Sequence, residues 1–144
     1  MNDDMRGASV LIVPREITEE IIQHAIDDNP NECCGILAGT ADRVLGQWRV
    51  LNAEASPYRY RMDPKEFLEV NNAIEERGWD ILGFYHSHTR TEAYPSDTDV
   101  RLARLVDWPG AYYLLVSLMP PGNPVIRGFS ITDQVVDEIA LEIG

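Results

Sequence analysis

The stretch Gly83–Asp99, GFYHSHTRTEAYPSDTD, holds the residues around which the rest of the chain is organised. It contains His86 and His88, two of the three histidines, separated by one residue. The run before them, WDILGFY, is apolar and aromatic, which is typical of a strand entering a core. If the strand continues through His88, its two-residue period puts both imidazoles on one face, roughly 6.5–7 Å apart at Cα. That spacing suits two nitrogen ligands of one metal ion.

A helix is predicted after Pro95, with Ser96 as its N-cap and Asp99 at the third helical position, an S-x-x-D capping box. Asp99 would then join the two histidines in a set of two imidazoles and one carboxylate. Three protein ligands with an open fourth position are the arrangement of catalytic zinc, whereas a structural site is closed by four ligands. Zinc is favoured on this ground, although nitrogen and carboxylate ligands also allow iron(II) or manganese.

Hydrolysis at such a centre needs a base that takes the proton of the attacking water. Glu32 opens the apolar run ECCGILAG and is the best-placed carboxylate, because a buried strand there would share a sheet with the histidines. Glu92 and Asp97 are nearer in sequence, but a loop and a helix start are normally solvated. Ser96 has a second role besides capping. If the helix N-terminus points into the site, its hydroxyl can meet a developing oxyanion.

Strand and helix patterns alternate along the rest of the chain. Strands are expected at 8–14, 32–39, 43–51, 79–88, 112–119, 125–132 and 135–143, with a short extended piece at 57–62. Helices are expected from Arg15 to the Asn29-Pro30-Asn31 stop, from the Asp63 N-cap to Gly78, and from Ser96 to the Trp108-Pro109-Gly110 stop. This order predicts an α/β domain with a mixed central sheet.

Composition limits the function classes. The 144 residues fit one domain, 1–144, with an ordered core at about 8–143. A net charge of −12 argues against nucleic acid as a partner, because an acidic surface repels phosphates. No apolar run approaches a membrane span, and the polar start Met1–Asp4 is unlike a signal peptide. The adjacent Cys33 and Cys34 are not expected to form a disulfide, so a cytoplasmic protein with reduced thiols is predicted.

The third histidine, His24, falls within the first predicted helix and is expected on a partly solvated flank. A ligand there would need a neighbour at helical spacing, and the carboxylates so placed are Glu20 and Asp28. Because isolated surface histidines are commoner than ligands, the surface role is preferred.

These residues together resemble the complete motif of the JAMM (MPN+) metalloproteases: Glu32, His86-Ser87-His88, Ser96 and Asp99. The resemblance covers residues 8 to 132. It includes the CGILAG run after Glu32 and the helix entry Tyr60-x-Met62-Asp63-Pro64. The most specific part, HSHTxTEAYPSxTD, is similar to actinobacterial enzymes that remove cysteine from the C-terminus of a small ubiquitin-like sulfur-carrier protein.

The resemblance implies a three-layer α/β/α fold, shared with the cytidine deaminases, and a zinc peptidase active in cysteine biosynthesis. It assigns His86, His88 and Asp99 to one Zn2+ with a bound water, Glu32 to the general base and Ser96 to the tetrahedral intermediate. No His or Cys follows His88, so a second, structural zinc is not expected.

The implied substrate is a ubiquitin-like carrier protein whose Gly-Gly tail lies extended in a groove near Tyr58–Met62. Tyr94-Pro95 either shapes the wall of that groove or is a stiff loop that places Ser96.

Other functions stay open at this stage. An isopeptidase would remove a ubiquitin-like modifier from lysine, and a binding or scaffold module would keep a vestigial metal. A nucleoside deaminase is disfavoured, because the P-C-x-x-C motif of those zinc sites is absent. The sequence leaves the identity of the carrier and the oligomeric state open, with a homodimer as one option.

Overall fold

The computed structural model describes residues 9–144, so Ala8 and the Met1–Asp4 segment lie outside the described residues. Its strands and helices follow the predicted order. They are β1 (Val10–Val13), α2 (Arg15–Asp28), β2 (Cys34–Thr40), β3 (Arg43–Val50), α3 (Pro64–Glu76), β4 (Asp80–His88), α4 (Asp97–Val106), β5 (Tyr112–Ser117), β6 (Val125–Thr132) and β7 (Val135–Ile143).

Within residues 9–144, the seven strands form one mixed sheet in the order β1-β3-β2-β4-β5-β6-β7, closed by parallel pairing of β1 with β7. Strand β4 lies at its centre, antiparallel to β2 and parallel to β5. The pairing between β1 and β3 is short and consists of one register pair, Ile12 with Arg43. The predicted α/β class with a mixed sheet is confirmed. The three-layer description is finer than this topology and stays a prediction.

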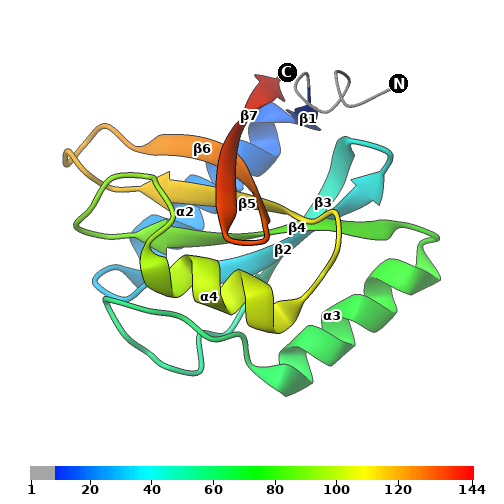
Figure 1. Ribbon diagram of the computed structural model, residues 1–144, viewed down its shortest axis with the longest axis horizontal. Coiled ribbons are helices and arrows are strands. Elements are labelled where there is room, and N and C mark those ends of the chain that lie inside the picture. The colour runs from blue at the N-terminus through cyan, green and yellow to red at the C-terminus, as the bar shows by residue number, and fades with distance from the viewer. Residues whose placement is uncertain (1–8) are drawn as a thin grey trace.

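Helices cover both faces of the sheet, with α3 and α4 on one side and α2 on the other (Figure 1). Each face has its own buried apolar cluster, and alternate residues of a strand enter opposite clusters. On β4, Phe84 packs in the cluster under α3 and α4, whereas Tyr85 packs in the cluster under α2. His86 and His88 continue the Phe84 side, so the metal-ligand candidates face α3 and α4.

Capping residues set the helix starts as predicted. The Asp63 carboxylate accepts from Glu66 N at 3.0 Å, and Pro64 is the first residue of α3. The capping box of α4 is complete, because Ser96 and Asp99 each bind the other's backbone N–H. Helix α3 ends at Glu76, and Gly78 follows with a φ of +72°.

Several strand ends differ from the prediction by one or two residues, and two differences bear on the site. Strand β2 begins at Cys34, so Glu32 lies in the loop before the strand. Residues 57–62 form no strand; one isolated bridge joins Met62 to Asn52. The loop is held instead by side-chain hydrogen bonds from Asn52, described below. These contacts depend on a residue outside the alternating segment, so the local pattern could not reveal them.

Cys33 and Cys34 are buried free thiols, and burial raises the pKa of Cys33 to about 12. None of the helices in the described part of the chain is long and apolar enough to cross a membrane.

Candidate metal centre

The structure brings His86, His88 and Asp99 together at the end of β4 and the first turn of α4. One ligand atom from each residue lies within 4.8 Å of the others. The three side chains are buried, with exposed fractions of 2%, 5% and 8% for His86, His88 and Asp99. The two histidines of the His-x-His run and Asp99 therefore form one compact donor set, as predicted.

A backbone carbonyl orients His88. Its Nδ1 lies 2.8 Å from the carbonyl oxygen of Glu92, and because a carbonyl only accepts, Nδ1 carries the proton. Nε2 lies 2.9 Å from Oδ2 of Asp99. This is the arrangement of a metal-ligating histidine, whose second nitrogen donates to a carbonyl or carboxylate and thereby fixes the tautomer.

His86 carries a buried nitrogen without a hydrogen bond. Its ring stacks on Tyr60, with centroids 4.4 Å apart and planes at 25°. Its Nε2 lies 3.1 Å from Oδ2 of Asp99, yet it makes no hydrogen bond of acceptable geometry. Buried polar atoms are normally satisfied, so this nitrogen points to a partner such as a metal ion.

Asp99 is held by the helix cap. Its Oδ2 accepts from Ser96 N at 2.9 Å, while its own N–H donates to Ser96 Oγ at 3.1 Å. Burial alone would raise the pKa of the Asp99 carboxyl, but His86 and His88 together with the Ser96 amide hold it well below its usual range. For His88, burial opposes the charge, but hydrogen bonds to Asp99 and to the Glu92 carbonyl raise its pKa. The site therefore favours a negative Asp99.

Two imidazoles and a carboxylate fit a zinc ion, and they also fit iron(II) or manganese. In the described residues, no fourth His, Cys, Asp or Glu joins the group. The donor set therefore leaves coordination positions for water and substrate, which is the arrangement of a catalytic rather than a structural site.

Glu32 lies beside this donor set, although it is 54 positions from His86 in the chain (86 − 32). Burial raises the pKa of its carboxyl to about 8, with His88 lowering it and Asp99 raising it, so both groups act on it electrostatically. The side chain is 5% exposed, and Oε1 has no hydrogen-bond partner. A buried carboxyl without a hydrogen-bond partner next to a metal donor set is a candidate general base.

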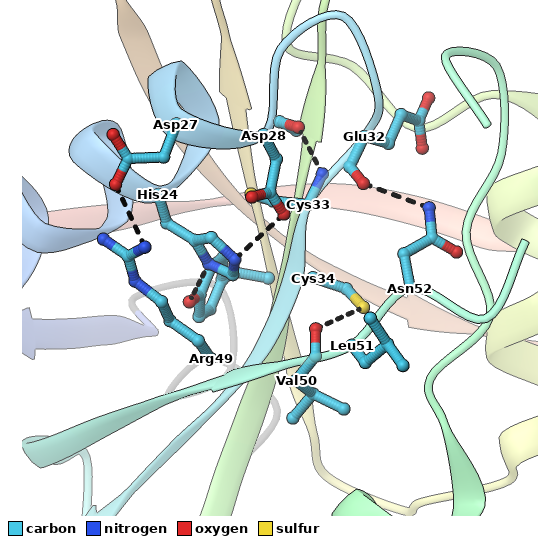
Figure 2. Close-up of polar contacts among 12 residues, drawn as sticks. His24, Asp27, Asp28, Glu32, Cys33, Cys34, Arg49, Val50, Leu51 and Asn52 are labelled. Carbon is cyan, nitrogen blue, oxygen red and sulfur yellow. Dashed lines mark hydrogen bonds and ion pairs between the residues drawn. The ribbon is translucent and has the colours of Figure 1, made fainter. Parts of the chain in front are cut away.

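Hydrogen bonds of the neighbouring Cys33 hold the Glu32 loop against β4. The neighbouring Cys33 N donates to Ser87 Oγ at 2.8 Å, and Ser87 N donates to Cys33 O at 3.1 Å. Because Ser87 stands between the two histidines, these bonds tie the Glu32 loop to the ligand strand. Figure 2 shows the Glu32 carbonyl bonded to Asn52 while the carboxylate extends away from that contact.

The other candidate residues occupy different places. Ser96 is exposed at the N-terminus of α4, and because its oxygen accepts from Asp99 N, its hydroxyl proton is available for donation. Glu92 and Asp97, the alternative bases, are both exposed. Glu92 contributes its backbone carbonyl to His88 rather than its carboxylate.

The predicted solvated position of His24 is wrong. The residue is 3% exposed and lies against the opposite face of the sheet, where Nδ1 is 2.7 Å from the Tyr85 hydroxyl and Nε2 is 3.3 Å from Asp28 (Figure 2). Burial lowers its pKa. The Asp28 contact follows from helical spacing, but the burial depends on Tyr85, which is remote in sequence.

A groove of about 370 Å³ lies between α3, α4 and the 52–62 loop. Its lining is mostly apolar and consists of Tyr60, Arg61, Met62, Pro64, Phe67, Phe84, Leu102, Ala103, Val106, Trp108 and Tyr113. Tyr60 belongs both to this lining and to the stack on His86, so it lies between the groove and the donor set.

Two residues near the site were missed as functional by the sequence analysis. Tyr60 was predicted in the helix entry and near the substrate groove but not as a contact of His86, and Asn52 was given no role. Tyr94, expected at the groove wall or in a stiff loop, is 45% exposed and packs its ring on Phe129. Arg127 lies over both rings, 5.8 Å from Tyr94 and 5.3 Å from Phe129.

Comparison with known proteins identifies relatives of the whole domain. The family described as prokaryotic homologs of the JAB domain matches residues 14–129. The CysO-cysteine peptidase of Mycobacterium tuberculosis is 42% identical over 131 residues, which cover 90% of this chain and 88% of that protein. The desampylase of Haloferax volcanii is 38% identical over 117 residues, covering 76% and 82%. The solution structure of a Desulfitobacterium hafniense protein superposes with a TM-score of 0.84 at 35% identity, covering 94% and 93%.

Proposed function

The chain belongs to the prokaryotic homologs of the JAB domain, as its JAMM (MPN+) motif predicted, and we propose that it uses one zinc ion to cleave the bond after a ubiquitin-like tail. His86, His88 and Asp99 hold the metal in this proposal. Glu32 is the general base, and Ser96 binds the oxyanion. The leaving group in this proposal is a C-terminal cysteine on a Gly-Gly-ended sulfur-carrier protein, and the similarity to the relative named CysO-cysteine peptidase supports it.

One observation carries the proposal. Among the residues that the structure describes, the buried side-chain polar atoms without a hydrogen-bond partner are Glu32 Oε1 and His86 Nε2. Leaving such groups unsatisfied costs roughly 1–3 kcal/mol each. A fold that keeps one unsatisfied ligand atom and one unsatisfied carboxylate oxygen at the same site supports a metal-dependent hydrolase more than a binding module.

The chemistry divides between the metal and the chain. A zinc ion held here would polarise the scissile carbonyl and acidify a water molecule. Glu32 takes the proton of the attacking water and returns it to the leaving amine, and its buried carboxyl next to the donor set supports this role. Ser96 donates its hydroxyl proton to the carbonyl oxygen as negative charge develops, and the N-terminus of α4 adds its positive dipole end.

The groove supports an extended tail as substrate. It is lined by α3, α4 and Tyr60, and Tyr60 contacts His86, so a chain lying in it would come within one side chain of the donor set. Glycines next to the scissile bond would pass the buried ligands most easily, because they carry no side chain. The proposed partner is therefore a protein, and neither nucleic acid nor a membrane is an expected partner. The cytoplasmic location and the homodimer stay predictions.

A second candidate is isopeptide cleavage, which removes a ubiquitin-like modifier from a lysine side chain. It is favoured by the similarity to the protein named desampylase. Both reactions place a Gly-Gly tail on the acyl side and differ in the amine that leaves.

The test uses zinc-loaded protein with two substrates of one Gly-Gly-ended carrier, one with a C-terminal cysteine and one joined to a lysine side chain. Intact-mass measurement should show loss of the cysteine residue from the first substrate, and addition of a chelator should stop it. Cleavage of the second substrate alone would establish the isopeptidase instead. If both masses stay unchanged with zinc confirmed in the protein, the proposed function is wrong.

A further inference from the structure

Asn52 makes four hydrogen bonds with its side chain and is only 7% exposed. Nδ2 donates to the carbonyl of Glu32 at 3.0 Å and to the carbonyl of Arg59 at 3.1 Å. Oδ1 accepts from the backbone N–H groups of Glu54 at 2.9 Å and of Arg61 at 3.0 Å. Both donor hydrogens and both acceptor positions of the amide are therefore used, and the orientation of the amide is fixed by its partners.

These bonds join two segments that meet at the donor set. One is the loop that carries Glu32, and the other is the 52–62 loop that carries Tyr60, whose ring stacks on His86. Figure 2 shows the bond from Asn52 to the Glu32 carbonyl. The second backbone anchor of Glu32 is its N–H, which donates to the carbonyl of Ser56 at 2.8 Å. Ser56 belongs to the same loop that Asn52 shapes through Glu54.

We propose that Asn52 is a positioning residue for the reaction: it holds the backbone of Glu32, and so its carboxylate, at the place where the attacking water is deprotonated. This inference rests on the proposed function. None of the four side-chain hydrogen bonds of Asn52 reaches a metal-ligand candidate, so Asn52 affects the reaction through Glu32.

The physical reason is that the Glu32 side chain has little support of its own. Oε1 has no hydrogen-bond partner, so the location of the carboxylate depends on the main chain that carries it. Both peptide groups of Glu32 are anchored by the Asn52-organised loop, at the carbonyl directly and at the N–H through Ser56. A displacement of a reacting group by about 1 Å can cost on the order of 100-fold in rate.

The main test variant is Asn52→Asp. It has nearly the same shape and keeps Oδ1 as an acceptor, but it replaces the Nδ2 donor by a carboxylate oxygen that faces two carbonyls. Asn123→Asp is the matched control, because Asn123 lies exposed in the turn before β6 and undergoes the same chemical change. Asn52→Ser, which keeps one donor and one acceptor, is measured in parallel and replaces Asn52→Asp under the same criteria if that variant does not fold.

Turnover and substrate binding separate a positioning role from a structural one. In zinc-loaded Asn52→Asp we expect kcat to fall about 10- to 100-fold with unchanged zinc content, while Asn123→Asp keeps the wild-type kcat. Carrier affinity is measured in the inactive Glu32→Gln background with and without Asn52→Asp, and the two dissociation constants should agree within about 2-fold. An unchanged kcat, or a fall in kcat/KM that equals the loss of carrier affinity, overturns the inference.

A measurement without turnover keeps the inference apart from the proposed function. Amide hydrogen exchange of the zinc-loaded protein should be faster in Asn52→Asp at Glu32 N–H and Ser87 N–H, and unchanged at the amides of β5. If the wild-type protein cleaves no carrier, the proposed function fails, and the exchange result alone decides about Asn52. Unchanged exchange at Glu32 shows that Asn52 does not position it.

Discussion

Oδ2 of Asp99 lies 2.9 Å from Nε2 of His88, and this contact joins the first turn of α4 to the end of β4. The same oxygen accepts from the N-cap amide of Ser96 at 2.9 Å. The capping box therefore sets the direction of the carboxylate independently of any metal. A donor set held by its own fold in this way needs little rearrangement on binding, which favours affinity.

Asp99→Asn should remove the metal. The amide keeps the size of the side chain but loses the charge and the anionic ligand oxygen, so we expect zinc content well below one equivalent under conditions that saturate the wild-type protein. Elemental analysis after gel filtration measures this. Asp97→Asn is the matched control, since it changes an exposed carboxylate in the same helical turn and should retain the metal. Full occupancy in Asp99→Asn would exclude Asp99 as a ligand.

Glu32→Gln should keep zinc and lose turnover. Glutamine fills the same space but cannot take a proton, and loss of a general base typically costs on the order of 10²- to 10⁴-fold in rate. Mass spectrometry of the carrier over time gives kcat. Glu92→Gln and Asp97→Asn test the two alternative bases and should stay active, because both side chains are exposed. Persistent hydrolysis by Glu32→Gln would show that another group is the base.

Ser96→Ala should lower kcat by about 10²- to 10³-fold, the usual cost of removing one oxyanion donor. It should also destabilise the protein by about 1 kcal/mol through loss of the N-cap. Asp63→Ala removes the N-cap of α3 and separates the two effects. We expect a similar fall in the melting temperature with unchanged kcat. If Ser96→Ala has the same kcat as Asp63→Ala, Ser96 acts only as a helix cap.

The metal-free protein should lose stability as the pH rises. Folded Glu32 keeps its proton up to about pH 8, whereas the unfolded chain releases it near 4.5, so the folded state holds the extra proton between these values. The contribution of Glu32 to the free energy of unfolding is therefore fully present below about pH 4.5 and is lost as the pH rises to about 8. In chelator-treated samples, the melting temperature of Glu32→Gln relative to wild type should increase from pH 5 to pH 9. A constant difference would contradict the raised pKa.

His24 should make the protein sensitive to acid. Its pKa is lowered by burial, so the unfolded chain takes up a proton near pH 6.5 before the folded state does. Stability present above pH 6.5 is thus lost as the pH falls below it. His24→Asn should cost roughly 1–3 kcal/mol at pH 7.5, because the Tyr85 and Asp28 contacts are weakened. Below pH 6.5 it should lose less further stability than wild type.

Thermal unfolding of zinc-saturated protein between pH 5 and 7.5 measures this difference. Gln23→Ala, at the exposed neighbouring position, should follow the wild-type profile. Parallel profiles for wild type and His24→Asn would show that His24 does not cause the acid sensitivity.

The elements and the donor set were predictable because their signals are local. His86 and His88 share a strand face through the two-residue period, and Asp99 is placed three residues after its N-cap. The capping box at Ser96 and the N-cap at Asp63 set the helix starts for the same reason. Strand–helix alternation along the chain was enough to predict the α/β class.

Features that depend on contacts between distant segments were not readable in this way. The burial of His24 requires Tyr85, which lies on β4 and faces α2. The 52–62 loop is organised by the side chain of Asn52 rather than by strand pairing. Glu32 was selected from its place before an apolar run, but its electrostatic contact with His88 exists only because β2 pairs with β4.

By itself, the sequence determined which residues could form a metal centre and on which local elements they stand, because strand period and helix capping act over a few residues. The tertiary structure decided what surrounds them: the buried Glu32 carboxyl beside the histidines, Asn52 bonded to the Glu32 carbonyl, His24 on the opposite face, and a sheet that closes from β7 to β1. These depend on packing between segments tens of residues apart, where local propensity carries no information.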